Sequence, residues 1–579
     1  MRLQVARDYI VLTKEKLCVC IDHKINEKGK EMVQNSLLIT NANIITCDPA
    51  NPRVEALFIF GDRIAEVGET KHIQELAGSR TQIIDAHGKT VTPGFIDVHM
   101  HPRGIFPDMK HRMHWVNLFD VSTMEGLIAS LKAKADVTPH EQWIQGRGYQ
   151  DSKIGKHPTR RDLDEVSTQH LITITHSSGH VSVVNSAVLE KADVGKNTPN
   201  PNGGAYDRYS DGTPNGVCRE SAAKGVREAT GVSLPVATTE EEKEGIALCL
   251  SNFVSKGITS INDTPADAGI SPDRLNLYQL MLKEGCLPLR VTMMIYYEPQ
   301  IIEALERVRL KTGFGSNMLK IGPLKLFAGN SLSGRTCWLY EPYLGSHKDD
   351  KPPYYGIPHP LVSSGQLKNI ILEGHKAGFQ WAVHSNGDRD IDALLDAYAS
   401  ALEQFPREDH RHRIEHCSIV GRDARILERI KHLGVIPVFH EYTYEHGDKY
   451  TDYGEERIAM MHAYRSALDL GIQPAGHSDW PVSAADPMLR IQSMVTRKSS
   501  QGVVYGPQQK VTPEEAIYVW TMGNARAIFE ERERGSIQVG KLADLVFLSN
   551  DPTRVPADSI KDIKVEKTIL GGKIAYEMD

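Results

Sequence analysis

The chain has 579 residues, of which 40% are hydrophobic and 24% charged, the balance of a folded globular protein rather than a disordered or fibrous one. Its length excludes a single small module and suits two to four domains, or one barrel-sized domain with additions. With 67 basic and 74 acidic residues the net charge is −7, so the attraction for phosphate backbones is missing and we expect no nucleic-acid partner. The 24 histidines point to no particular chemistry by their number alone.

Residues 1–35 mix charged and apolar side chains without the continuous apolar segment of a secretory signal, so we expect an N-terminal extension that carries no export signal. No run of roughly 18 uncharged apolar residues occurs, so neither a membrane span nor a membrane partner is expected. The eight cysteines are scattered and form no Cys-x-x-Cys pair, which is typical of reduced thiols. These features predict a cytoplasmic protein.

Short strands of alternating polarity occur near both ends of the chain. Residues 36–90 contain several of them, separated by turns, and residues 536–579 contain more of the same kind. Neither part has enough strands to bury one face of a sheet alone. We therefore predict one small β-sandwich domain formed from both chain ends, with everything between them inserted.

The middle of the chain, residues 91–535, alternates short apolar runs with helix-length amphipathic stretches. This alternation is typical of parallel strands that are buried on both faces. Eight such units predict an α/β fold, a closed (β/α)8 barrel of the TIM type. The interval between the first two runs is too long for one connection, so we predict a large insertion after barrel strand 1 with a subdomain at about 140–250. The eight runs are Val91–Val98, Gly257–Ile261, Leu287–Ile295, Ile321–Phe327, Gln380–His384, His412–His416, Val435–Phe439 and Ile472–His477.

Candidate metal ligands stand at the carboxyl ends of these runs, where barrel active sites are built. His99 and His101 follow the first run, and the period of two places both on one face of a strand. One strand-end histidine is more often a structural residue than a ligand. Several together predict a divalent metal, with Zn²⁺ favoured by imidazole and carboxylate ahead of Mn²⁺, Fe²⁺ or Ni²⁺. The remaining candidates are Lys325, His384, His416 and Asp479.

The chain resembles the amidohydrolase superfamily, and within it the branch of YtcJ-like proteins and N-substituted formamide deformylases, amidohydrolase family 3. The resemblance spans about residues 37–579. It rests on the segments TPGFIDVHMH (Thr92–His101), HPTR (His157–Arg160), HSSGH (His176–His180), GVCRE (Gly216–Glu220), RIEH (Arg413–His416) and HSDWPV (His477–Val482).

This resemblance implies a metal-dependent hydrolase with one or two ions per chain, held by His99, His101, Lys325, His384, His416 and Asp479. In the family the lysine can carry CO₂ as a carbamate that bridges two metals, which implies N6-carboxylation of Lys325. Homodimers are common among such proteins, so a homodimer is expected here too. The alternative for Lys325 is an unmodified lysine paired with a neighbouring carboxylate.

Two departures from the family pattern occur near these ligands. The family segment after the lysine usually reads like Asp-Gly-Ser, whereas this chain has Ala328-Gly329-Asn330 and loses the acid. The family's His-Ala pair is His384-Ser385 here, which leaves the ligand intact. The first departure changes the electrostatics beside Lys325.

Bond cleavage in an amide needs an activated water, because neutral water attacks a neutral carbonyl poorly. A bound Zn²⁺ lowers the pKa of its water to about 7 and polarises the carbonyl. Asp479, beside the last strand end, is the expected catalytic residue, acting as base and then as acid toward the leaving nitrogen.

The sequence gives weaker evidence for the residues that contact the substrate. His176 and His180 flank a short loop in the insertion and would either contact the substrate or hold that loop in place. Glu220, Arg335 and Trp480 are further candidate substrate-binding residues, with core packing as the alternative for the tryptophan. No role is assigned to His111, His114, His440 or His446.

Three functions remain open at this point. The first is a hydrolase that cleaves a carbon–nitrogen bond, such as that of an N-formyl or N-acyl amide, in a small non-peptide molecule. The second uses the same site as a deaminase or a cyclic-amide hydrolase. The third is a non-catalytic scaffold on an enzyme fold, which would have no need of all six ligand positions.

Overall fold

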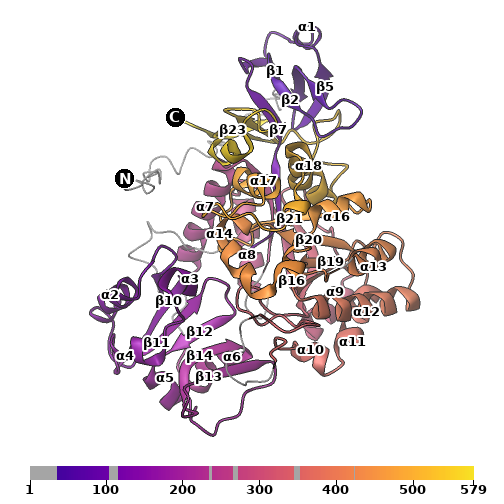
Figure 1. Ribbon diagram of the computed structural model, residues 1–579. Helices are drawn as coiled ribbons and strands as arrows, with labels where there is room; N and C mark the ends of the chain where they lie inside the picture. Colours follow the sequence, from indigo (N-terminus) through magenta and orange to yellow (C-terminus); the bar gives the residue numbers. More distant parts are fainter. Residues whose placement is uncertain (1–35, 103–114, 234–237, 265–271, 345–352, 423) are drawn as a thin grey trace.

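The computed structural model describes residues 36–102, 115–233, 238–264, 272–344, 353–422 and 424–579 (Figure 1). The N-terminal extension predicted at residues 1–35 lies outside the described residues, as do His111 and His114. None of the described helices is both long enough and apolar enough to cross a membrane.

Eight parallel strands form the central sheet, and their order along the sheet follows their order in the chain. Two backbone hydrogen bonds join the last strand region to the first: His101 N–H donates to the Trp480 carbonyl at 2.8 Å, and Asp479 N–H to the His99 carbonyl at 3.1 Å. The (β/α)8 barrel predicted from the apolar runs is therefore confirmed. Its strands are β8 (Phe95–Met100), β15 (Ile258–Asp263), β16 (Arg290–Tyr296), β17 (Leu319–Phe327), β18 (Trp381–Ser385), β19 (Arg413–His416), β20 (Ile436–His440) and β21 (Ala475–His477).

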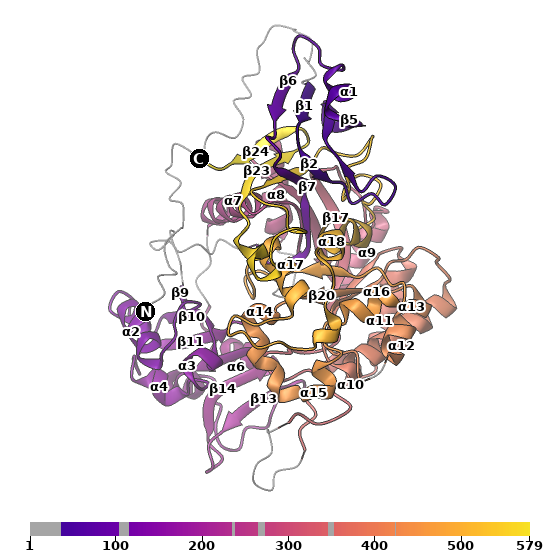
Figure 2. The same ribbon diagram turned by 45° about the horizontal axis from the view of Figure 1, so that its top comes forward.

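Helices between these strands cover the outside of the barrel (Figure 2). Residue choice explains where several begin and end: Thr238 and Glu241 form a capping box at the start of α7, and Gly434 ends α13 with φ of 65°. The longer barrel helices are α7 (Thr239–Ser255), α8 (Pro272–Lys283), α9 (Pro299–Arg307), α11 (Leu367–Lys376), α12 (Asp388–Gln404), α13 (Arg425–Leu433), α16 (Tyr464–Asp469) and α17 (Pro487–Thr496).

The first apolar run, Val91–Val98, is not one strand. It divides at Gly94 into β7 (Thr90–Pro93), which belongs to another sheet, and barrel strand β8. A Cβ on Gly94 would lie 2.2 Å from Oγ1 of Thr259 in β15, so only glycine allows the backbone to approach there. The contact that divides the run comes from a residue far along the chain, which no local pattern reveals.

Two sheets form a small sandwich from both chain ends, as the sequence predicted. The four-stranded sheet has the order β5-β4-β1-β6, and the six-stranded sheet has the order β24-β23-β22-β7-β2-β3. In Figure 1 the indigo and yellow strands lie together at one end of the molecule. Their shared core contains Ile39, Leu57, Val91, Leu545 and Ile569. The strands are β1 (Ser36–Thr40), β2 (Asn43–Ile45), β3 (Arg53–Val54), β4 (Ala56–Phe60), β5 (Arg63–Gly68), β6 (Gln82–Asp85), β22 (Leu545–Leu548), β23 (Val565–Leu570) and β24 (Lys573–Glu577).

The insertion after the first barrel strand forms a mixed six-stranded sheet of order β13-β14-β12-β11-β10-β9. Its first strand begins at Trp115, earlier in the chain than the range of about 140–250 expected from sequence. Separate apolar cores cover its two faces, around Ile172 on one and Val184 on the other. Its elements include β9 (Trp115–Asn117), α2 (Met124–Ala135), β10 (Trp143–Tyr149), β11 (Leu171–His176), β12 (Val181–Val184), β13 (Gly204–Arg208), β14 (Pro214–Glu220) and α6 (Ser221–Ala229).

Candidate metal centre

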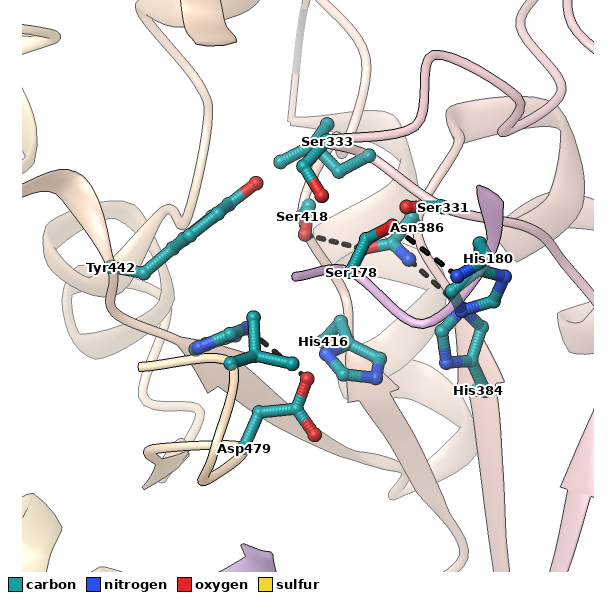
Figure 3. Close-up of a pocket in the computed structure, with 13 residues that line it drawn as sticks. Ser178, His180, Ser331, Ser333, His384, Asn386, His416, Ser418, Tyr442 and Asp479 are labelled. Atoms are coloured by element: carbon teal, nitrogen blue, oxygen red, sulfur yellow. Dashed lines mark hydrogen bonds and ion pairs between the residues drawn. The ribbon is translucent and has the colours of Figure 1, made fainter. Parts of the chain in front are cut away.

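The carboxyl ends of the barrel strands meet in one pocket of about 320 Å³. Figure 3 shows His416 between Asp479 and His384 in this pocket, with His180 beside His384. Parallel strands end at the same rim of a barrel, so residues that are far apart in the chain come together there. The lining consists of Ser178, His180, Ser331, Leu332, Ser333, His384, Asn386, His416, Ser418, His440, Tyr442, Asp479 and Val482.

Three of the other five sequence-predicted ligands, His99, His101 and His416, gather around Asp479. Within the described part of the chain, three groups place one ligand atom per residue within 4.8 Å of one another. They are His99, His101 and Asp479; His416, His440 and Asp479; and His99, His416 and His477. Imidazole nitrogens with a carboxylate oxygen are a donor set that suits a divalent transition metal.

The hydrogen bonds of His101 fix which of its ring nitrogens is free. Nδ1 pairs with the backbone carbonyl of Thr264, and a carbonyl only accepts, so Nδ1 carries the proton. In the neutral ring Nε2 then presents a lone pair, which lies 3.0 Å from Oδ1 of Asp479. Two lone pairs repel at that distance unless a cation or a proton lies between them.

His99 lies two residues earlier, on the same face of the strand, and its ring is held in the same way. Its Nδ1 pairs with the Glu415 carboxylate, which two bonds of 2.8 Å from Arg413 hold in place. Its Nε2 faces Oδ1 of Asp479 at 3.5 Å. A carboxylate behind the ring is how proteins commonly orient metal-ligating histidines. The residues present therefore fit a bound cation.

Burial keeps the histidines of this centre neutral, which is the form that binds metal. It lowers the pKa of His99, His416, His440 and His477 well below the usual value, and Lys325 lowers those of His99, His416 and His477 further. Burial alone would raise the pKa of Asp479, but His101, His440 and Lys325 outweigh it and lower the pKa, so the carboxylate is ionised. The centre thus combines neutral nitrogens with one negative oxygen.

Lys325, in β17, is completely buried and its Nζ has no hydrogen-bond partner among the described residues. Burial lowers its pKa to about 8, although the Glu415 and Asp479 carboxylates raise it. An unpartnered buried amine is costly, so a further group is expected at this atom. The structure shows no direct ion pair of Lys325 with a carboxylate within the described residues.

His384 lies beside the three ligand groups rather than within them. Its ring centroid is 4.3 Å from that of His416, and its Nε2 lies 3.0 Å from the Asn386 amide nitrogen and 3.2 Å from the Asn330 carbonyl oxygen. Asn330, at the departure from the family pattern, turns its side-chain amide to the Ile357 carbonyl at 2.6 Å. The loop that loses the acid is thereby anchored by neutral groups.

His440 and His477 belong to the centre, yet sequence reasoning gave neither of them a role. His477 has no hydrogen-bond partner at either ring nitrogen among the described residues. The signal was present in the sequence, because His440 directly follows the seventh apolar run and His477 ends the eighth. The strand-end rule that found His384 and His416 also selects these two.

The candidate substrate contacts divide into two groups. His180 lines the pocket, and its Nδ1 lies 2.7 Å from the carboxylate of Glu220, which stands behind it and outside the lining. Burial opposes protonation of His180, but Glu220 outweighs it and raises the pKa. His176 is engaged at both ring nitrogens, by Ser178 and Asp151.

Arg335 and Trp480 lie outside the described lining of the pocket. The guanidinium of Arg335 pairs instead with the Asp452 carboxylate at 2.6 Å, and its side chain is half exposed. Trp480 packs edge-on against Phe253 at 5.2 Å and adds to the barrel core. Core packing, the alternative for the tryptophan, is the arrangement found.

Three residues of the site have backbone conformations that side chains rarely adopt. The φ angles are 70° at His416, 56° at Asp479 and 51° at Glu220. Strained positions of this kind persist where the surrounding structure holds them, and they cluster at functional sites.

A closed parallel barrel with histidines, a lysine and an aspartate at its carboxyl rim is the architecture of amidohydrolases. The chain belongs to the amidohydrolase family, whose profile matches residues 82–576. It is 26% identical to the YtcJ protein of Bacillus subtilis over 91% of this chain and 96% of that one. It is 26% identical to the N-substituted formamide deformylase of Arthrobacter pascens over 93% of this chain and 98% of that one.

The fold is shared with a solved structure from Pyrococcus furiosus, titled an uncharacterized metal-dependent hydrolase. That protein superposes with a TM-score of 0.65 and 26% identity, over 90% of this chain and 100% of its own. The sequence resemblance to the family is thereby confirmed.

Proposed function

We propose that the protein is a metal-dependent hydrolase that cleaves a carbon–nitrogen bond in a small non-peptide molecule, such as an N-formyl or N-acyl amide. The observation that carries the proposal is the pair of histidine Nε2 atoms, on His99 and His101, that face one oxygen of Asp479 and, in the neutral rings with Nδ1 protonated, offer it no proton. A divalent cation at that point satisfies all three atoms. Similarity to a formamide deformylase and to a metal-dependent hydrolase supports the same reaction class.

The metal, with Zn²⁺ the favoured ion, would be held by His99, His101, His416 and Asp479, with His384, His440, His477 and Lys325 close by. When bound, it would polarise the substrate carbonyl and make water a better nucleophile at neutral pH. Asp479 would take the proton of the attacking water and return it to the leaving nitrogen, because its ionised carboxylate opens onto the pocket.

Carboxylation of Lys325 is part of the proposal. Its Nζ is buried without a partner, and the pKa of about 8 leaves part of the amine unprotonated near neutral pH. The neutral amine can add to CO₂, and the resulting carbamate is an anion that attracts metal where an ammonium repels it. Two ions per chain follow if the carbamate bridges them, and one if it does not.

The polarity of the pocket supports a polar substrate. Hydroxyl and amide groups from Ser331, Ser333, Ser418 and Asn386 make up much of its wall.

The test is a measurement of products from protein purified without chelator, with the metal content determined on the same sample. A panel of N-formyl, N-acetyl and cyclic amides and ring amines is offered, and carboxylic acid and ammonia are measured separately. An acid released together with an amine supports the amide reaction, whereas ammonia alone shows a deaminase and a ring-opened acid a cyclic-amide hydrolase. Absence of metal, with turnover unchanged by chelation, would overturn the proposal.

A further inference from the structure

A second group of catalytic character lies at the same pocket, on the insertion rather than on the barrel. Oγ of Ser178 is 2.8 Å from Nδ1 of His176, and Nε2 of His176 is 3.1 Å from Oδ1 of Asp151. Ser178 lines the pocket, and its side chain is partly exposed, whereas His176 is completely buried. A serine, a histidine and an aspartate in this order of contact can activate a serine nucleophile, and here Nδ1 rather than the usual Nε2 faces the hydroxyl.

The hydrogen bonds of the loop decide the protonation of His176. Its Nδ1 accepts the backbone N–H of Ser178 at 3.1 Å, and an N–H only donates, so Nδ1 carries no proton. The ring proton is therefore on Nε2, where it is donated to Asp151. The lone pair of Nδ1, which the Ser178 N–H and the Ser178 hydroxyl share, is the base within reach of that hydroxyl.

Asp151 is held in place from the barrel side. Lys449, which follows β20 and is 4% exposed, contacts the same carboxylate oxygen at 2.5 Å. Burial would raise the pKa of Asp151, but His176 and Lys449 outweigh it and lower the pKa, so the carboxylate is ionised. His157 lies 3.8 Å from its other oxygen. The orienting acid is therefore charged and fixed by residues of two structural units.

We propose that Ser178 is a reactive nucleophile that accepts the acyl group of an ester or similarly activated acyl compound entering the pocket. Oγ of Ser178 bonds to the acyl carbon while Nδ1 of His176 takes the hydroxyl proton. The bond to the leaving alcohol breaks, and the alcohol departs with that proton. Water then attacks the acyl-serine, which releases a carboxylic acid and restores the hydroxyl. This activity is independent of the metal-dependent hydrolysis proposed above.

The test is covalent labelling of the holoprotein with diisopropyl fluorophosphate, followed by mass spectrometry of the peptide that contains Ser178. Oγ bonds to phosphorus, fluoride leaves, and His176 takes the proton. We expect one adduct on Ser178, none in Ser178→Ala, and labelling slower by about a hundredfold in His176→Gln and Asp151→Asn, the usual worth of a general base. Ser130→Ala, which removes a hydroxyl of α2 that bonds the Gly126 carbonyl outside the pocket lining, should label at the wild-type rate.

The variants separate this activity from a structural role and from the metal site. If the three residues only hold the loop, Asp151→Asn changes the unfolding temperature and leaves the labelling rate unchanged, which overturns the proposal. An unlabelled Ser178 in the wild-type protein overturns it as well. If His176→Gln fails to fold, the labelling rate of Asp151→Asn still tests the proposal. Labelling that persists in Asp479→Asn, where amide turnover is lost, shows that the two activities are separate.

Discussion

Glu415 is the residue whose replacement tests the metal centre without removing a ligand. Its carboxylate is completely buried, pairs with Nδ1 of His99 and accepts two 2.8 Å bonds from Arg413. In Glu415→Gln the amide keeps the shape but loses the charge that orients the ring and raises its basicity. Residues that hold a ligand in this way are worth about 10–100-fold in metal affinity, or about 1.4–2.7 kcal/mol.

The affinity is measured by competition with a chromogenic zinc chelator, and the unfolding of metal-free protein by urea is followed in parallel. We expect weaker binding by the factor above, together with lower stability, because Arg413 keeps a buried charge without its partner. Glu373→Gln is the matched control, since Glu373 accepts a bond from Tyr297 on the outside of the barrel. Affinity equal to that of the wild type in Glu415→Gln would refute the orientation of His99 inferred from these contacts.

Three further predictions concern single side chains. Asp479→Asn should retain metal by elemental analysis and lose about 10²–10⁴-fold in turnover, the worth of general acid–base catalysis; a near-wild-type rate would remove the proton transfer from Asp479. Lys325→Ala should bind less metal per chain, and an unchanged stoichiometry would leave Lys325 with a structural role only. Arg290→Met, which strands the buried Asp544 carboxylate, should cost about 3–5 kcal/mol in urea unfolding. Arg307→Met, at an exposed ion pair, should lower the free energy of unfolding only slightly. Equal losses in both variants would contradict the importance of burial.

The barrel could be predicted because its strands are short, apolar and separated by helices, which are local properties. Each of the eight apolar runs overlaps a barrel strand, so the rim positions of His99, His384 and His416 followed. The boundary at Gly94 did not follow, because the run of residues 91–98 was predicted as one strand, although the Pro93-Gly94 pair within it is a typical break signal. What divides it is contact with Thr259 and a hydrogen bond from its N–H to the Asp544 carbonyl. Both partners are set by tertiary structure.

The loop residues around the pocket were harder to predict than the strand-end residues at its base. Strand ends meet at a rim by geometry, whereas loop residues such as Arg335 face whatever partner the fold supplies, here Asp452. His180 and Glu220 came together because β12 and β14 are neighbours in the inserted sheet. The paired residues are 40 positions apart in the chain, and the sequence pattern does not show which residues of β12 and β14 lie opposite each other.

The protonation of the histidines in the centre follows from three-dimensional contacts and could not be predicted from the sequence. The sequence places His101 and Asp479 at one rim, where the simplest expectation is an ordinary hydrogen-bonded ion pair. On the other side of the ring the Thr264 carbonyl accepts a hydrogen bond from Nδ1–H of His101, and the Glu415 carboxylate accepts one from Nδ1–H of His99. In their neutral forms both histidines are thereby acceptors toward the same carboxylate oxygen. Two residues that are not ligands thus convert a histidine–aspartate cluster into a site that a cation or a proton must complete.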